Sequence, residues 1–301
     1  MVTTVNLGGL ILKNPVTVGS GTFGYGKEMA GFYDISRLGG ISVKGTSLEP
    51  RQGNPYPRTC ETASGLLNAI GLQNPGAQKV RDEYLPYLEA FDTKVILNII
   101  GSAVEEYAAL AEMFDPEDRV DAFEINVSCP NVKSGCMAFG TSAQGVESVV
   151  KAVRLRTGKP IITKLSPNVT DIAEMARAAE AAGSDAVSLV NTFLGTAIDP
   201  YKRRFILANR TGGLSGPCIK PLALRMVNDV FRSVKIPVLG QGGIMNGTDA
   251  VEFMLAGATA VSVGTANLTR PDAALGVVRG IEEYMRETGV EDISSLIGAA
   301  I

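Results

Sequence analysis

The stretch FEINVSCPNVKSGCMAFG, residues 123–140, gives the first indication of the fold. Its first part predicts a buried strand that ends near Asn126, because apolar and β-branched residues alternate along it. Residues 128–131 then begin a loop of polar and turn-forming residues. The stretch therefore places a thiol, that of Cys129, directly after a strand, where parallel strands deliver side chains to a ligand crevice.

Apolar runs of the same kind recur along the whole chain and alternate with helical patterns. Strands are expected at residues 15–20, 40–44, 94–99, 121–127, 160–165, 185–191, 236–241 and 259–264. Helices are expected at about residues 26–34, 77–90, 103–114, 144–156, 170–182, 218–233, 247–256 and 271–286. Eight βα units predict an α/β protein with a parallel (β/α)₈ barrel, a fold of typically ~250 residues.

The chain is longer than a typical barrel of ~250 residues, and a hairpin and three long loops account for the additional residues. Two short apolar runs at residues 5–7 and 10–12, joined by two glycines, predict an N-terminal hairpin. Three long loops are expected over the C-terminal face of the barrel, at residues 45–76, 128–143 and 192–217. No linker divides the chain, so we expect residues 1–301 to form a single domain.

Composition excludes several classes of protein. The chain is 45% hydrophobic with a net charge of −3, so a large core is possible and no nucleic-acid footprint is visible. No apolar run is long enough to span a bilayer and the N-terminus lacks a signal-peptide layout, which predicts a cytoplasmic protein without a membrane contact. The four cysteines show no CxxC spacing, so no metal or cluster site is expected and the thiols should be free.

The chain contains no histidine, which removes the usual general base. Proton transfer must then depend on Cys, Lys, Tyr or a carboxylate. Cys129 is a candidate, although a lone cysteine is more often a small buried residue. Two flanking amides, Asn126 and Asn131, make a core position unfavourable, because a core would have to satisfy both of them.

The expected strand ends together predict a polar pocket. Each residue alone could be a satisfied amide or a solvated lysine, but several unpaired groups in one core would each cost ~1–3 kcal/mol. The residues at these ends are Ser20, Lys44, Asn98, Asn126, Lys164, Asn191, Gly242-Gly243 and Gly264-Thr265.

Two glycine-containing segments predict a phosphate site. GQGGI (240–244) ends the seventh strand and VGTA (263–266) ends the eighth, where barrels commonly bind phosphate through backbone N–H groups. Either segment alone could be an ordinary turn. GSGTFG (19–24) matches a dinucleotide-binding pattern, but Lys44 stands where that pattern needs an acid, so we regard the match as coincidental.

Seven motifs in order resemble those of dihydroorotate dehydrogenases, flavin enzymes of pyrimidine synthesis, along essentially the whole chain. They are KGTSLEPRQGNPYPR (44–58), LLNAIGLQNPG (66–76), NVSCPN (126–131), VNTF (190–193), GGLSG (212–216), GQGGI and VGTA. Cys129 is similar to the base of the soluble Cys branch. The segment ETASGLLNAIGLQNPG resembles the NAD-linked form, whose catalytic chain pairs with an electron-transfer subunit.

The resemblance implies one non-covalent FMN and a set of binding residues. For FMN these are Ser20, Lys44, Gly45, Asn98, Asn126, Lys164, Val190, Gly216, Gly242, Gly243, Gly264 and Thr265. For dihydroorotate they are Lys44, Asn68, Ala69, Ile70, Gly71, Leu72, Asn126, Asn131, Asn191 and Thr192. Amide side chains suit the imide edge of the substrate, and Lys44 suits its carboxylate.

The resemblance also implies the chemistry and the partners. Cys129 would remove the C5 proton, and Lys164 would stabilise charge that gathers on the flavin. A partner subunit would hold FAD and a [2Fe–2S] cluster, around a central dimer of this chain in a heterotetramer. Three alternatives stay open: a fumarate-linked single-subunit enzyme, a Schiff-base aldolase that uses Lys164 or Lys44, and a catalytically silent binding barrel.

Overall fold

The computed structural model describes residues 1–128 and 139–300, and within them a parallel barrel surrounds the core. Its strands, in spatial order, are β3 (Val16–Val18), β16 (Ala260–Val263), β15 (Val238–Gln241), β10 (Ala186–Leu189), β9 (Ile161–Lys164), β8 (Ala122–Asn126), β7 (Lys94–Ile99) and β4 (Gly40–Ser42). The two outermost strands of this order meet where the Gly39 amide donates to the Val16 carbonyl, 3.0 Å away. The predicted (β/α)₈ barrel is therefore confirmed.

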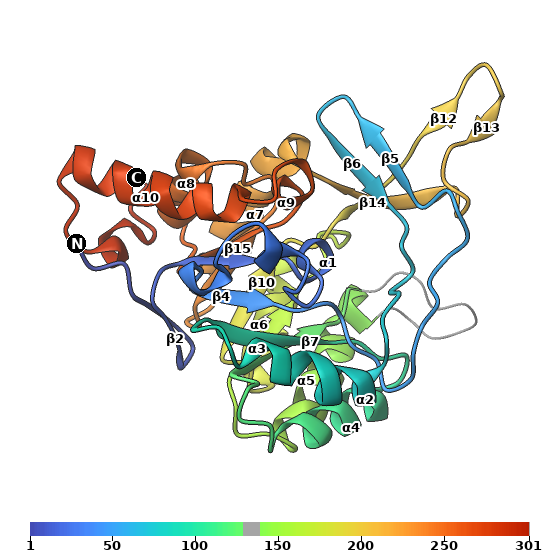
Figure 1. The fold of residues 1–301 in the computed structure, drawn as a ribbon, viewed down its shortest axis with the longest axis horizontal. Helices are drawn as coiled ribbons and strands as arrows, with labels where there is room; N and C mark the ends of the chain where they lie inside the picture. Colours follow the sequence, from blue (N-terminus) through green and yellow to red (C-terminus); the bar gives the residue numbers. More distant parts are fainter. Residues whose placement is uncertain (129–138, 301) are drawn as a thin grey trace.

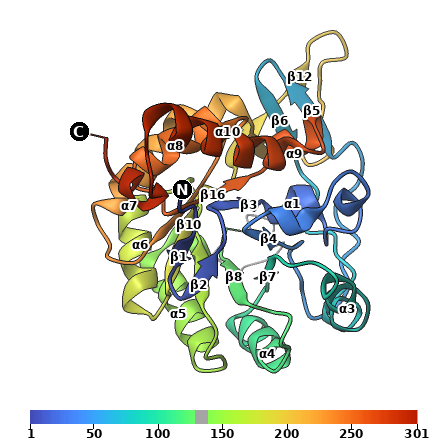
Figure 2. The same cartoon turned by 60° about the vertical axis from the view of Figure 1, so that its left-hand side comes forward.

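Helices surround these strands, as Figure 2 shows. The longer ones are α4 (Val104–Phe114), α5 (Ala143–Arg154), α6 (Ile172–Ala181), α7 (Lys220–Phe231), α8 (Gly247–Leu255) and α10 (Ala273–Thr288). Short helices are α1 (Ser20–Phe23), α2 (Ala77–Lys79), α3 (Leu85–Leu88) and α9 (Ala266–Thr269). Among the described residues, no helix has the length and apolar character needed to cross a membrane.

The helix expected at residues 26–34 is wrong. The chain instead forms α1 directly after β3 and then two 3₁₀ turns, Met29–Gly31 and Ile35–Arg37. Within that range, the first residue, Gly26, has a φ of 81° and the last, Asp34, is extended, with φ of −69° and ψ of 104°, so neither end is helical. The second expected helix, 77–90, is interrupted by a π-helical turn, Val80–Tyr84.

The N-terminal hairpin has the predicted bounds. It pairs β1 (Val5–Leu7) with β2 (Leu10–Leu12), and in both strands the outer residues are buried while the middle one is exposed. At its turn, a Cβ on Gly8 would lie only 2.2 Å from the carbonyl oxygen of Asp185, just before β10. The hairpin therefore covers the N-terminal end of the barrel.

Two of the segments expected as loops contain strands, so that part of the prediction is wrong. Residues 45–76 and 192–217 together form an antiparallel sheet of β11 (Phe193–Thr196), β14 (Thr211–Ser215), β6 (Gly65–Asn68) and β5 (Thr59–Thr62). A small ribbon of β12 (Ile198–Asp199) and β13 (Arg204–Phe205) extends from it. Figure 1 shows this sheet projecting on the side away from the termini. Its strands are short and rich in glycine and polar residues. β5 pairs with β6 and β11 pairs with β14 locally, whereas the pairing of β6 with β14 joins segments about 145 residues apart in sequence.

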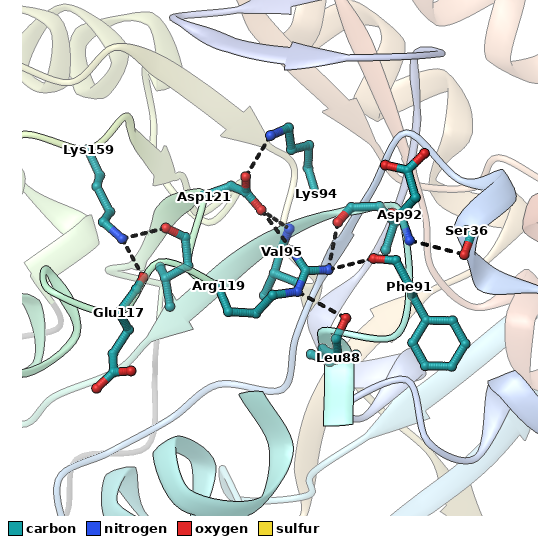
Figure 3. Close-up of polar contacts among 12 residues, drawn as sticks. Ser36, Leu88, Phe91, Asp92, Lys94, Val95, Glu117, Arg119, Asp121 and Lys159 are labelled. Carbon is teal, nitrogen blue, oxygen red and sulfur yellow. Dashed lines mark hydrogen bonds and ion pairs between the residues drawn. The ribbon is translucent and has the colours of Figure 1, made fainter. Parts of the chain in front are cut away.

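A charged network joins β7 and β8 at their N-terminal ends (Figure 3). Arg119 donates to the carbonyl oxygens of residues 88, 91 and 93 at 3.0, 3.1 and 2.8 Å, and to the Asp121 carboxylate at 3.2 Å. Lys94 pairs with the same carboxylate at 2.7 Å. Lys159 donates to the carbonyl oxygens of Glu117 and Val120, both at 2.6 Å. These cations add charged donors to backbone carbonyl groups of the loops, and three of these groups, those of Leu88, Phe91 and Glu117, also accept a backbone amide.

We expect Arg119→Met to lower the free energy of unfolding by about 2–3 kcal/mol, because it removes a charged donor from three carbonyl groups and one of the two cations that pair with the Asp121 carboxylate. Urea unfolding followed by circular dichroism measures this. The matched control is Arg156→Met, since Arg156 lies 3.7 Å from Glu112 and both side chains are at least half exposed. The control should change stability by less than ~0.5 kcal/mol, and equal losses in the two variants would contradict the role given to Arg119.

Candidate active site

Polar side chains meet at the C-terminal end of the barrel, as the strand-end pattern predicts. Asn126 and Lys164 are the last residues of β8 and β9 and are register partners. Asn98 lies on the neighbouring β7 and is fully buried. Ser20 begins α1 directly after β3, beside Gly264, because the amide of Gly19 bonds to the Val263 carbonyl at 2.8 Å. The structure therefore brings these four predicted residues to one end of the barrel.

Glu124 lies at the centre of this group and is not among the residues predicted from the sequence. Its side chain is buried, 1% exposed, and accepts hydrogen bonds from residues on both sides of its own strand. The donors are Ser42 Oγ at 2.8 Å, Asn98 Nδ2 at 2.5 Å and Ser188 Oγ at 2.8 Å, and Lys164 Nζ lies 3.7 Å away. These partners come from β4, β7, β10 and β9, so the carboxylate points into the barrel and connects five adjacent strands.

The carboxylate of Glu124 is held in its charged form. Burial alone would raise its pKa, but the charge of Lys164 and the hydrogen bonds from Ser42, Asn98 and Ser188 together lower the pKa below its usual value. A signal in the sequence could have revealed this residue. Glu124 and Asn126 are two positions apart on one strand and must point to the same face. An acid on the polar, interior face of a strand needs partners there.

The amide of Asn98 has a defined orientation. A carboxylate can only accept, so the Asn98 nitrogen must face Glu124 and the oxygen must face away from it. That oxygen is buried and has no hydrogen-bond partner. It lies against Gly45, where an added Cβ would be 2.9 Å from it. Asn98 therefore presents an unused acceptor beside Gly45, and the half-buried Lys44 precedes that glycine.

Two predicted amides are neighbours. Asn191 Nδ2 donates to Asn126 Oδ1 at 3.4 Å, and the same oxygen accepts the backbone amide of Ser128 at 3.2 Å. The Asn191 side chain in turn accepts the Thr192 amide at 2.9 Å. The Tyr107 hydroxyl donates a hydrogen bond to the Asn126 carbonyl oxygen at 2.9 Å, and this bond fixes the end of β8. The pair forms a small amide surface between the ends of β8 and β10.

The segment of residues 68–72 begins at the last residue of β6, which pairs with β14. Asn68 Nδ2 donates to the Gly213 carbonyl at 3.3 Å, and an added Cβ on Gly213 would lie 2.0 Å from the Thr192 hydroxyl. Asn68 and Thr192 thus contact the same glycine. Asn54 fixes the rest of the segment by donating from its side chain to Ala69 and from its backbone to Ile70, both at 3.0 Å.

The turn after Ile70 is tight. Gly71 has φ of 75°, and an added Cβ would lie 2.5 Å from the side-chain carbon of Asn54. Leu72 follows with φ of 59°, which is uncommon for a residue with a side chain. The segment of residues 68–72 is therefore held in one backbone conformation by contacts from residue 54.

The predicted phosphate segments lie together, with Gly216 between them and the start of α7. Gly242 and Gly243 have φ of 123° and 88°, and an added Cβ on Gly243 would lie 2.8 Å from Lys220 Cβ and 3.0 Å from the Gly216 carbonyl oxygen. Val190 lies against the first of these glycines, 3.1 Å from its Cβ position. No side chain could fit at these two glycines without displacing α7.

Gly264 differs from these glycines, because an added Cβ would meet nothing within 4 Å. Its neighbour Thr265 donates its hydroxyl to Ser215 Oγ at 2.8 Å, which connects β16 to β14. Gln241, at the end of β15, has a buried side-chain nitrogen without a hydrogen-bond partner. The two glycine segments therefore have open space beside Gly264 and an unpaired donor, Gln241 Nε2, near their backbone amides.

Two predicted residues, Cys129 and Asn131, lie outside the described residues, as does the second loop thiol, Cys136. The described thiols are those of Cys60, on β5, and Cys218, which is exposed in the 3₁₀ turn before α7. Cys218 lies 3.8 Å from the Ser215 carbonyl oxygen.

Comparisons with known proteins agree with one another. A family model described as dihydroorotate dehydrogenase matches residues 2–285. The chain is 55% identical over 296 residues to a protein of Bacteroides fragilis, with 98% of each chain covered. It is 56% identical over 295 residues to a protein of Parabacteroides distasonis, covering 98% of this chain and 97% of that one. Both relatives are named "Dihydroorotate dehydrogenase B (NAD(+)), catalytic subunit".

Proposed function

The chain belongs to the dihydroorotate dehydrogenase family, and we propose that it oxidises dihydroorotate to orotate in pyrimidine synthesis as the FMN-containing catalytic subunit of an NAD-linked enzyme. The observation that supports this most directly is the group of amides and lysine at the C-terminal end of the barrel, beside two glycine segments suited to phosphate. A Schiff-base mechanism fits less well. It needs a neutral amine, which at Lys164 would leave the buried Glu124 carboxylate without a counter-charge.

The described residues fit FMN. The flavin ring carries an imide N–H that needs an acceptor, and Asn98 Oδ1 is a buried acceptor without a partner. The ring also has carbonyl oxygens and nitrogens that accept from donors such as Gln241 Nε2 and Lys164. Backbone amides at Gly243 and Gly264 suit the phosphate, because the absence of side chains lets its oxygens approach the chain.

We propose that the full set of FMN-binding residues is the one that the family resemblance implies. It consists of Ser20, Lys44, Gly45, Asn98, Asn126, Lys164, Val190, Gly216, Gly242, Gly243, Gly264 and Thr265. Bound FMN supplies the acceptor for a hydride.

The proposed substrate site uses the amide surface described above. Orotate and dihydroorotate are cyclic imides with a carboxylate, so Asn126 and Asn191 can offer the donors and acceptors that the ring edge needs. Asn68 and Thr192 extend this surface: Thr192 bonds to the Asn191 side chain, and both Asn68 and Thr192 contact Gly213. Lys44 and the backbone of residues 69–72 suit the carboxylate, and Asn131 completes the proposed set.

Cys129 is the proposed base that takes the proton from C5 while a hydride leaves C6. A free cysteine has a pKa of ~8.5, so only a fraction is thiolate near neutrality and the rate should rise with pH. We expect Cys129→Ala to retain FMN and to slow flavin reduction by dihydroorotate by ~10²–10⁴, the usual contribution of a positioned base. Stopped-flow absorbance measures this rate.

The matched controls are Cys136→Ala, in the same loop, and Cys218→Ala, an exposed thiol near β14. Both should reduce flavin at nearly the original rate. A large loss in Cys136→Ala with none in Cys129→Ala would assign the base to the other thiol. Full activity in all three variants would reject Cys129 as the base, whereas FMN binding without flavin reduction in the original chain would favour the silent binding barrel.

The phosphate site can be tested at Gly264. An added methyl group at this position touches nothing in the protein, so Gly264→Ala should fold normally. If the phosphate occupies that space, the variant should bind FMN at least about tenfold more weakly, the cost of losing one hydrogen bond to a charged group. Isothermal titration of FMN into flavin-free protein measures this. Gly158→Ala is the control, because its Cβ also meets nothing within 4 Å but lies before β9 at the N-terminal end of the barrel.

The electron acceptor is proposed to be NAD, reached through a second subunit that holds FAD and an iron–sulfur cluster, in a heterotetramer around a dimer of this chain. Both relatives described above are named as catalytic subunits, which supports a second subunit. We expect the isolated chain to reduce artificial dyes with dihydroorotate but to form almost no NADH. Robust NADH formation by this chain alone would contradict the two-subunit proposal, and efficient reduction of fumarate would favour the single-subunit alternative.

A further inference from the structure

Glu124 has more hydrogen-bond partners than a structural role in a barrel requires. A buried ion pair contributes little net stability, because the cost of removing two charges from water exceeds or balances their attraction. Apolar side chains of similar volume would fill the same space at lower cost. The arrangement of donors is also specific, since two neutral hydroxyls from β4 and β10 bond to opposite oxygens of the carboxylate and fix its position.

The remaining two partners of this carboxylate are residues of the proposed FMN site. Asn98 donates to it and therefore turns its oxygen away from it. Lys164 places its ammonium 3.7 Å from the same carboxylate oxygen, with a side chain that is 8% exposed. A change at residue 124 must therefore alter both groups at once: the orientation of an amide and the net charge at the end of β9.

We propose that Glu124 is a positioning residue for the flavin: it sets the orientation of the Asn98 amide and offsets the charge of Lys164, and thereby lowers the reduction potential of bound FMN. This inference rests on the proposed function. Reduced flavin carries more negative charge than oxidised flavin, so Lys164 stabilises the reduced form. A fixed negative charge beside that lysine opposes this effect, because charges in a poorly solvated interior are weakly screened.

The test is the midpoint potential of FMN in the full chain, measured by equilibrium reduction with reference dyes. Glu124→Gln removes the negative charge with little change in shape. It should strengthen binding of reduced FMN relative to oxidised FMN about tenfold, a rise of ~30 mV for a two-electron couple. Lys164→Gln should shift the potential in the opposite direction. The double variant should lie between the two, because it removes both charges of the pair.

Asp121→Asn is the matched control. Asp121 is also a partly buried carboxylate paired with cations, but it precedes β8 at the opposite end from the site. This variant should lose stability without a change in potential. An unchanged potential in Glu124→Gln, or equal shifts in Glu124→Gln and Asp121→Asn, would overturn the inference.

Folding and FMN binding are separate readouts. If Glu124→Gln alone does not fold, the contribution of the carboxylate is the difference in potential between Lys164→Gln and the double variant, which buries no unpaired charge at this pair. The double variant should then have the higher potential, and equal values would overturn the inference. A wild-type chain that binds no FMN would reject the proposed function, whereas normal FMN binding with an unchanged potential in Glu124→Gln rejects this inference alone.

Discussion

The Glu124 carboxylate imposes a constraint on half of the barrel. A charge that is 1% exposed must be surrounded by donors, and these come from four other strands. A register shift of one residue in any of those strands would turn its donor to the opposite face of the sheet. The requirement to satisfy one anion therefore specifies the alignment of β4, β7, β9 and β10 against β8, and the same alignment brings Asn98 and Lys164 to the ligand.

The two ends of the barrel satisfy their polar groups differently. At the N-terminal end, Arg119 and Lys159 bond to backbone carbonyl oxygens, and Asp121 accepts from two cations. At the C-terminal end, buried side-chain atoms of Asn98 and Gln241 have no partner in the protein. Leaving such groups unsatisfied costs free energy, which a ligand recovers when it binds. The N-terminal end, where these polar groups are paired, therefore stabilises the barrel, whereas the C-terminal end, where buried atoms stay unpaired, is suited to bind a ligand.

Much of the fold could be predicted from the sequence, because buried parallel strands are short continuous apolar runs and all eight were found within a few residues. The helix expected at 26–34 was wrong, because its first residue, Gly26, has a positive φ and its last, Asp34, is extended. The strands β5, β6, β11 and β14 were missed because they are short and contain glycine and polar residues instead of an apolar run, and because the β6–β14 pairing that joins them links distant segments. In the site, strand-end polar residues were evident, whereas Glu124 was read as part of an apolar run, although its spacing from Asn126 placed both on the interior face.

The antiparallel sheet has a consequence that the strand-end pattern alone did not indicate. Thr192 directly precedes β11, Asn68 ends β6, and both contact Gly213 on β14. Two residues further along β14, at its last residue, Ser215 bonds to Thr265 in the glycine segment after β16. One short strand thus connects the proposed substrate residues to the proposed phosphate site. Because the residues that make these contacts, Gly213 and Ser215, are two positions apart on one strand, β14 fixes the spacing of the two sites. Segments that look like loops in the sequence therefore become part of the binding site.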